Sequence, residues 1–377
     1  MKETRILLAS ILKPVTDTRM YHKFGLSLAK IPQAAVHVVG FATPLPTNAP
    51  HNVFFHPIFS FPRLSPKRFL VSLKFLYLLA RVKPQVVIIC TPELLVAGLI
   101  YKLFSSCSLI YDVQENYYLN IKSQGVYPNL MKDLLGSFVR LNEKLASYFI
   151  QQFLLAEKSY AQELTFLRDN YIILENKFKP ESLEEPINYI SKGVQVNPAP
   201  IKLLYSGTIS KLYGIFEAIE LANALFKVNN AVSLTIIGYC PQPEVYQQVI
   251  TQIKNKPYIT LIGGKTLVPH AQITEAIRNN TLGLLPYHSH PSISHCIPTK
   301  LYEYMANGLP VIVEQNPYWQ PIIDHYQAGI HINYQAYKQE EILEELYKQV
   351  FYKGRDLREA FWETEEKKLL NWFQKVL

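Results

Sequence analysis

The sequence predicts an α/β protein built from two doubly wound parallel-sheet domains in tandem. Short apolar runs alternate with longer amphipathic segments, which is the pattern of parallel strands joined by helices that cover both faces of a sheet. Residues 179–200 are polar, contain several prolines and lack periodicity, as expected of a link between domains. The alternation then restarts at Ile201. A chain of 377 residues is long enough for two such domains.

In the first half, six apolar runs have the length and composition of buried strands. They are residues 5–11, 36–40, 86–90, 109–111, 149–155 and 171–174. Amphipathic segments between them predict helices at residues 21–30, 66–82, 94–104 and 131–147. The helix at 66–82 has a capping residue, Ser65, and a proline, Pro66, at its first position.

In the second half, the predicted strands are residues 201–206, 232–238, 258–262, 282–285, 310–313 and 330–332. The predicted helices are residues 215–228, 244–254, 271–278, 299–307 and 340–353. Residues 355–377 are expected to form one or two charged helices with Trp362 and Trp372 as apolar anchors. We therefore place domains at residues 1–185 and 186–354, and the C-terminal helices of residues 355–377 could cross back to the first domain.

The net charge of +8 comes from 38 Lys and Arg against 30 Asp and Glu, and it is unevenly distributed. Residues 18–92 contain no acidic residue and nine basic ones, so this segment accounts for the whole excess. A uniformly basic protein of the ribosomal or histone kind is therefore excluded, and a locally basic face is predicted. Lys67, Lys74 and Arg81 are seven residues apart on one predicted helix. That stripe could lie on an anionic membrane surface or could be an ordinary solvated helix face.

Cysteines and histidines give little sign of a disulfide framework or a metal site. The four cysteines form no CxxC pair, which fits a reducing compartment. His288, His290, His295 and Cys296 match no metal-ligand spacing, so no metal is expected. The apolar stretch 86–104 is broken by Thr91-Pro92-Glu93, so it predicts strand, turn and helix in place of a membrane span.

Two segments of the second half could bind a phosphorylated ligand. Gly207 follows a strand and precedes a helix N-terminus, and Lys211 adds a cation, although an ordinary turn has the same features. In the helix that begins near Thr299, Lys300 and Glu303 share one face of the expected first turn. They could meet a diphosphate and the hydroxyls of a ribose. The alternative is a helix with a simple ion pair between them.

In the first half, one strand end gathers polar side chains. The strand at 109–111 runs into Asp112, Gln114, Glu115 and Asn116. The carboxyl ends of strands are where α/β domains keep their sites. A polar loop with side-chain-capped turns is an equally open interpretation.

Taken together, these residues resemble the glycosyltransferase family 4 group of the GT-B superfamily. The matching runs occur in the family's order at residues 205–208, 234–238, 259–263, 284–286 and 298–312. The last, Pro-Thr-Lys-Leu-Tyr-Glu-Tyr-Met-Ala-Asn-Gly-Leu-Pro-Val-Ile, is the most specific. Residues 111–115 and Asp17-Thr18-Arg19 are similar to segments of the family's first domain.

The resemblance implies two Rossmann-like domains facing across a cleft, with the donor on the second and the acceptor on the first. It implies a retaining transfer of a sugar from a UDP- or GDP-sugar to an acceptor hydroxyl, without a metal or other cofactor. The implied acceptor is a lipid-linked glycan of a bacterial envelope polysaccharide, at the cytoplasmic face of the membrane. Two alternatives stay open, a nucleotide-sugar 2-epimerase and a non-catalytic GT-B subunit.

The resemblance also implies roles for individual residues. Glu303 would hold the donor ribose, Lys300 and Lys211 the diphosphate, and the amides near Gly207 and Thr208 the phosphates. Further donor-binding positions are Gly238, Gly263, Gly264, Lys265 and Thr299. His295 stands where the family has a glutamate that touches the donor sugar, and Gln114 stands where many members have histidine. Thr208 and Tyr213 replace an arginine and a lysine of the family, which keeps the non-catalytic alternative open.

Overall fold

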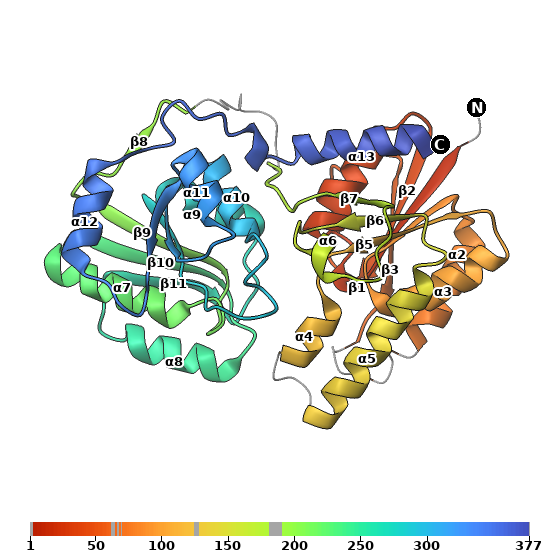
Figure 1. The fold of residues 1–377 in the computed structure, drawn as a ribbon, viewed down its shortest axis with the longest axis horizontal. Coiled ribbons are helices and arrows are strands. Elements are labelled where there is room, and N and C mark those ends of the chain that lie inside the picture. Colours follow the sequence, from red (N-terminus) through yellow and green to blue (C-terminus); the bar gives the residue numbers. More distant parts are fainter. Residues whose placement is uncertain are drawn as a thin grey trace. The chain divides into compact units, whose positions relative to one another are not determined.

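A computed structural model describes residues 3–61, 65, 68, 70–123, 128–180 and 191–376. The chain forms two compact units (Figure 1). Unit 1 contains Met1–Lys179 together with Trp362–Leu377, and unit 2 contains Pro180–Phe361. The boundary predicted between residues 185 and 186 lies outside the described residues. The predicted C-terminal segment is divided, since residues 355–361 belong to unit 2 and only the rest belongs to unit 1.

Unit 1 has one parallel sheet of seven strands in the order β3-β2-β1-β4-β5-β6-β7. The strands are β1 (Thr4–Pro14), β2 (Ala34–Phe41), β3 (Val53–Phe59), β4 (Val86–Ile89), β5 (Ser108–Val113), β6 (Gln152–Leu155) and β7 (Tyr171–Ile173). The strand order reverses between β1 and β4. Strand β3 was not predicted from the sequence because Pro57 interrupts it, and β3 tolerates the proline as the edge strand of the sheet.

The helices of unit 1 are η1 (Thr18–Gly25), α1 (Leu26–Leu28), α2 (Val71–Val82), α3 (Pro92–Leu103), α4 (Tyr117–Ser123), α5 (Asn129–Ala146), α6 (Tyr160–Glu163) and α13 (Glu363–Val376). The helix predicted at 21–30 is a π-helical segment, η1, followed by the short α1. Helix α2 begins at Val71, and Pro66 and Lys67 lie outside the described residues. Lys74 and Arg81 are exposed on α2.

The last helix, α13, packs on unit 1. Figure 1 shows it, in blue, beside the red elements that open the chain. Trp362, just before α13, is buried with Phe373 in the same core as Ile6 and Phe24. The Trp372 indole packs against this core and donates a hydrogen bond to Gln152 Oε1 at 2.8 Å. Both predicted tryptophan anchors therefore hold the chain end on unit 1.

Unit 2 has a parallel sheet of six strands in the order β11-β10-β9-β12-β13-β14. The strands are β9 (Ile201–Thr208), β10 (Val232–Tyr239), β11 (Ile259–Gly264), β12 (Leu282–Leu285), β13 (Val311–Glu314) and β14 (Gly329–Ile332). The helices are α7 (Ile215–Val228), α8 (Pro243–Ile253), α9 (His270–Asn279), α10 (Thr299–Ala306), α11 (Gln320–Tyr326) and α12 (Gln339–Lys348), with a short turn η3 (Arg358–Ala360). A small antiparallel pair joins β8 (Val194–Gln195) to β15 (Val350–Phe351).

The fold class predicted from the sequence is confirmed, because each unit has a parallel sheet whose strand order reverses once. In unit 2 the reversal lies between β9 and β12. Ligands of doubly wound folds bind at the carboxyl ends of the strands beside such a reversal. Among the described residues, no helix has the length and hydropathy needed to cross a bilayer.

Candidate functional site

Three glycines lie in register across the carboxyl ends of neighbouring strands in unit 2. Gly207 of β9 is paired with Gly238 of β10, which is paired with Gly263 of β11. A Cβ atom on Gly238 would lie 1.7 Å from the carbonyl oxygen of Gly207, so any other residue would force β9 and β10 apart. The strand order thus presents a strip of bare backbone that a ligand can approach closely. Gly264 follows at the end of β11.

Lys300, the second residue of α10, is turned toward this strip. A Cβ atom on Gly207 would lie 2.8 Å from Lys300 Cε. The Nζ atom lies 4.8, 5.6 and 5.4 Å from the ring centroids of Tyr205, Tyr213 and Tyr287. We call these three residues the tyrosine cage.

The tyrosine cage surrounds the lysine ammonium group with aromatic faces. Among the described residues, no oxygen accepts a hydrogen bond from Lys300 Nζ. Removal from water lowers the pKa of Lys300 to about 7, and the nearby Glu303 carboxylate opposes this effect. An anionic ligand at this position would supply the counter-charge that the protein does not provide.

Glu303 lies one turn further along α10, and its partner is unexpected. Its Oε1 is 3.1 Å from Nε2 of His270, the first residue of α9. The prediction of a first-turn position for Glu303 is wrong, because α10 begins at Thr299 and Glu303 is its fifth residue. No ion pair joins it to Lys300 in the part of the chain that the structure describes, since Lys300 turns toward β9. The sequence does not indicate that His270, which comes 33 residues earlier, contacts Glu303.

The remaining predicted donor-binding residues lie around the same edge. Thr208 is the exposed last residue of β9, two residues beyond the predicted strand end, and its carbonyl accepts a hydrogen bond from the Tyr205 hydroxyl at 3.0 Å. Lys211 and Lys265 are exposed, with Nζ atoms 6.0 and 5.1 Å from the rings of Phe216 and Tyr246. Their predicted roles toward a diphosphate and a base stay predictions.

His295 lines a separate hollow of unit 2. It is exposed, and its ring centroid lies 4.6 Å from that of Tyr318. Both residues line a cavity of about 230 Å³ at the carboxyl ends of β12 and β13. Tyr287 of the tyrosine cage also lines this cavity, so the cavity adjoins the position of Lys300.

The histidines near this cavity have other partners. His288 Nε2 is 2.9 Å from a carboxylate oxygen of Glu217, and His290 Nδ1 is 2.8 Å from the Ser292 hydroxyl. Within the described ranges, no three His, Cys, Asp or Glu residues are grouped so that they could hold a metal ion.

In unit 1, two motifs that are far apart in the sequence meet in a buried ion pair. Arg19 Nη2 is 2.6 Å from Asp112 Oδ1, and both side chains are almost completely buried. Gln114 joins this pair, because its Nε2 donates to Asp112 Oδ2 at 2.6 Å and its Oε1 accepts from Lys13. The predicted site residue Gln114 is thus held rigidly, with 8% of its surface exposed.

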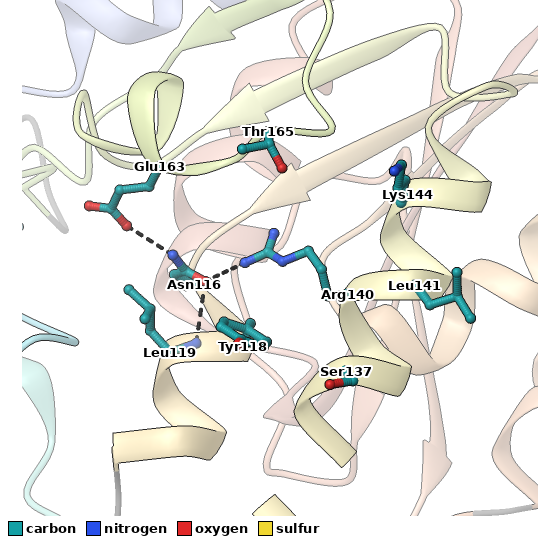
Figure 2. A pocket seen from close by; sticks show the side chains of 9 residues that line it. All are labelled: Asn116, Tyr118, Leu119, Ser137, Arg140, Leu141, Lys144, Glu163 and Thr165. Carbon is teal, nitrogen blue, oxygen red and sulfur yellow. Dashed lines mark hydrogen bonds between the residues drawn. The ribbon is translucent and has the colours of Figure 1, made fainter. Parts of the chain in front are cut away.

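A pocket of about 600 Å³ opens beside this network, between α4, α5 and the segment around α6 (Figure 2). The Asn116 side chain donates to Glu163 Oε2 at 2.9 Å and accepts from Arg140 Nη2 at 2.7 Å. The Arg140 guanidinium lies 5.4 Å from the Tyr118 ring centroid. Figure 2 shows these groups converging. The sequence indicated only Asn116, because Arg140 and Glu163 lie on helices whose packing it does not reveal.

Arg140 also connects the pocket to a buried carboxylate. Its Nη1 is 3.2 Å from an oxygen of Glu143, which accepts a hydrogen bond from the Tyr111 hydroxyl at 2.8 Å. Burial raises the pKa of Glu143 to about 7, although Arg140 and the Tyr111 hydrogen bond oppose the effect.

Comparisons with known proteins agree with this architecture. Residues 187–367 match the family described as Glycosyl transferases group 1. Sucrose-phosphate synthase from Thermosynechococcus elongatus superposes with a TM-score of 0.66 at 13% identity, covering 100% of this chain and 99% of that one. HepE from Anabaena, in complex with UDP and glucose, gives 0.62 at 13% identity, covering 99% and 100%. An α,α-trehalose-phosphate synthase from Burkholderia xenovorans gives 0.64 at 9% identity, covering 98% and 100%. A search of curated proteins gives no match.

At these identities the structural likeness shows the fold alone, and the family match concerns residues 187–367, most of which lie in unit 2. The strip of glycines and the caged lysine lie at the carboxyl ends of the strands, beside the reversal of strand order, where doubly wound folds bind their ligands. Residues 187–367 therefore match the model of the group 1 glycosyl transferases, and the chain has the two-domain GT-B fold.

Proposed function

We propose that this chain transfers a hexose from a UDP- or GDP-sugar to an acceptor hydroxyl, with retention of the anomeric configuration. The observation that carries the proposal is Lys300 in the tyrosine cage, beside the bare backbone at Gly207. A cation that lacks a counter-charge, at the start of a helix and at a sheet reversal, suits a nucleotide diphosphate. HepE, which shares the fold, binds UDP, and this supports the choice of donor.

The residues of unit 2 would stabilise the departing diphosphate. As the bond between the sugar C1 atom and the phosphate oxygen breaks, negative charge grows on that oxygen. Lys300 and the N-termini of α7 and α10 would bind this charge without reorganisation. The Glu303 carboxylate, oriented by His270, would accept hydrogen bonds from the ribose hydroxyls. The cavity lined by His295 would hold the sugar.

No side-chain nucleophile is needed in this scheme. The acceptor oxygen forms its bond to C1 on the face that the phosphate leaves, and the departing phosphate oxygen takes the acceptor proton. Retention follows because attack and departure use the same face of the sugar. No metal is required, since cationic side chains and helix N-termini carry out the neutralisation.

The acceptor would bind unit 1. Asn116, Arg140 and Glu163 offer the planar polar groups that hydrogen-bond to sugar hydroxyls, and the Tyr118 ring offers a face for a pyranose. We propose a lipid-linked glycan of an envelope polysaccharide as the acceptor. The enzyme would then work at the cytoplasmic face of the membrane.

The test is a thermal-shift screen of the full chain with UDP-, GDP-, ADP- and CMP-sugars, followed by transfer assays with the donor that stabilises it. We expect stabilisation by a UDP- or GDP-sugar, loss of that shift in Lys300→Met, and its retention in Lys227→Met, which changes an exposed lysine on α7. The anomeric configuration of the product is read by NMR.

Three outcomes overturn the proposal. No stabilisation by any donor rejects a nucleotide-sugar site. Conversion of the donor without an acceptor identifies an epimerase. Donor binding without turnover across a panel of glycan acceptors identifies a non-catalytic subunit.

A further inference from the structure

Three neighbouring helices of unit 1 expose large apolar side chains. Helix α2 lies against α3, and α3 lies against α5. Leu73 and Tyr77 on α2 are 65% and 71% exposed, and Leu103 and Phe104 at the end of α3 are 72% and 87% exposed. Soluble proteins seldom leave this many large apolar side chains of neighbouring helices open to water. We call the exposed side of α2, α3 and α5 the apolar face.

Helix α5 is the most regular part of the apolar face. Its exposed apolar residues recur at alternating intervals of three and four and therefore form one stripe along the helix. They are Met131, Leu134, Phe138, Leu141, Leu145 and, just after the helix, Tyr148. The residues that α5 buries, Gly136, Glu143 and Ala146, lie on the opposite side. The helix thus turns its apolar stripe away from its own core.

The charges beside this surface are mostly basic. Helix α2 has no acidic residue, and Lys74, Arg81 and the adjacent Lys83 are exposed. On α3 and α5 the acidic groups are paired or buried. Glu93 pairs with Arg68, Asp133 with Lys122 at 2.8 Å, and Glu143 lies inside. Apolar side chains flanked by exposed cations match the chemistry of an anionic bilayer surface.

A second copy of the chain fits the surface less well. A pair of α5 helices would cover the stripe but leave the apolar residues of α2 and α3 exposed. It would also bring together surfaces that carry the same charge. A bilayer covers all three helices at once, and Tyr77 and Tyr148 have the amphipathic rings that favour the membrane interface.

We propose that the apolar face of α2, α3 and α5 docks unit 1 on an anionic bilayer. The purpose of this docking rests on the proposed function, because docking would bring a lipid-linked acceptor to the pocket of unit 1. Ser137, Leu141 and Lys144 of α5 line that pocket, and Leu141 also belongs to the apolar stripe. The pocket and the membrane surface would therefore adjoin along one helix.

The test is co-sedimentation of the full chain with vesicles of phosphatidylcholine, with and without phosphatidylglycerol. Leu134→Gln with Phe138→Gln removes apolar area while keeping good helix propensity, and roughly tenfold weaker binding or more is expected. Lys74→Gln with Arg81→Gln should weaken binding to the anionic vesicles about 25-fold, at roughly fivefold per cation. Neither residue pair belongs to the proposed donor or acceptor site.

Unit 2 offers matched controls. Val228→Gln with Ile250→Gln removes two exposed apolar residues from helices, and Lys227→Gln with Lys254→Gln removes two exposed cations. Both control variants should bind vesicles like the wild type. All variants should keep the thermal shift produced by the donor.

The proposal is overturned if the wild type does not bind anionic vesicles, or if the Leu134/Phe138 variant binds them as the wild type does. A third outcome also overturns it: the wild type does not bind vesicles, light scattering shows that it is a dimer, and the Leu134/Phe138 variant is a monomer. The apolar face would then be a self-association site. Failure of docking leaves donor stabilisation and transfer to a soluble acceptor intact. If the proposed function is wrong, donor stabilisation or transfer to a soluble acceptor is absent whether or not the chain binds vesicles. The two failures are therefore distinguishable.

Discussion

Lys300→Met should change stability and donor affinity in opposite directions. The substitution removes the ammonium group but keeps an unbranched apolar side chain to pack against Gly207. In the unliganded protein, the charge of Lys300 is withdrawn from water without an anionic hydrogen-bond partner among the described residues. In the donor complex, the same charge would meet the diphosphate. Lys300 would thus lower the stability of the unliganded protein and raise its affinity for the donor. We therefore expect the Lys300→Met variant to be more stable and to bind the donor more weakly.

The size of the effect follows from the surroundings of Lys300. Its pKa falls from 10.5 to about 7, which corresponds to a penalty of ~5 kcal/mol on the charged form. Three aromatic rings at cation–π distance return about 0.5–1 kcal/mol each. We therefore expect Lys300→Met to raise the free energy of unfolding by about 2–3.5 kcal/mol near pH 6. Loss of a charge-assisted contact should weaken UDP binding roughly 10- to 100-fold.

The pH dependence has a definite sign. The folded pKa of Lys300 lies below its unfolded value, so between about 7 and 10.5 the unfolded state binds more protons. Wild-type stability should therefore gain a contribution as the pH rises through this window, and the advantage of Lys300→Met should shrink. Urea unfolding of both proteins near pH 6 and pH 9 measures this, with Lys227→Met as the control for an exposed lysine.

Binding supplies the second half of the test. Calorimetric titration of UDP near pH 8, in buffers with different ionisation enthalpies, should show proton uptake by the wild type but not by Lys300→Met. The reasoning is refuted if the variant is no more stable than the wild type near pH 6 while its UDP affinity is unchanged. That result would mean that the tyrosine cage is only a packing arrangement.

Four further predictions concern single positions. Glu303→Gln should lower UDP affinity about tenfold or more by calorimetry. The melting temperature should change little, because glutamine keeps the size of the side chain and an oxygen that can accept a hydrogen bond from His270. His295→Ala should alter the rate or the donor preference across a panel of sugars, and unchanged kinetics would count against its proposed contact. Gly238→Ala should destabilise the protein by about 3 kcal/mol or more in urea, because its methyl group would lie 1.7 Å from the Gly207 oxygen. Burial raises the Glu143 pKa from 4.5 to about 7, so wild-type stability should lose ~3 kcal/mol as the pH rises through that window, and Glu143→Gln should remove the loss.

The positions of the strands were predictable because buried parallel strands are nearly continuous apolar runs. Val86–Ile89 and Leu282–Leu285 are buried throughout, and both stand out in the sequence. The edge strand β3 was not predictable in this way, since it is only partly buried and contains Pro57. The short helices α4, α6 and α11 were also missed, because each has too few turns to show a period.

The site was predictable where a local rule applies. Gly207, Gly238 and Gly263 each follow an apolar strand, and parallel register brings strand ends together. The tyrosine cage was not predictable, because Tyr205, Tyr213 and Tyr287 come from three segments that only the folded sheet unites around Lys300. Arg19 and Asp112 likewise belong to separate motifs, and only the packing of η1 on the sheet shows that they form one buried ion pair.

Helix α5 shows why an apolar stripe alone does not identify the face that a helix buries. Its stripe from Met131 to Leu145 is visible in the sequence, and the usual rule would place it against the sheet. The structure buries Glu143 instead, because that carboxylate accepts from the Tyr111 hydroxyl of β5 and contacts Arg140, which reaches the pocket. A helix that turns Glu143 inward to hold this network turns its apolar stripe outward. Such an arrangement is stable in water only at a cost, and contact of the stripe with a bilayer would remove that cost.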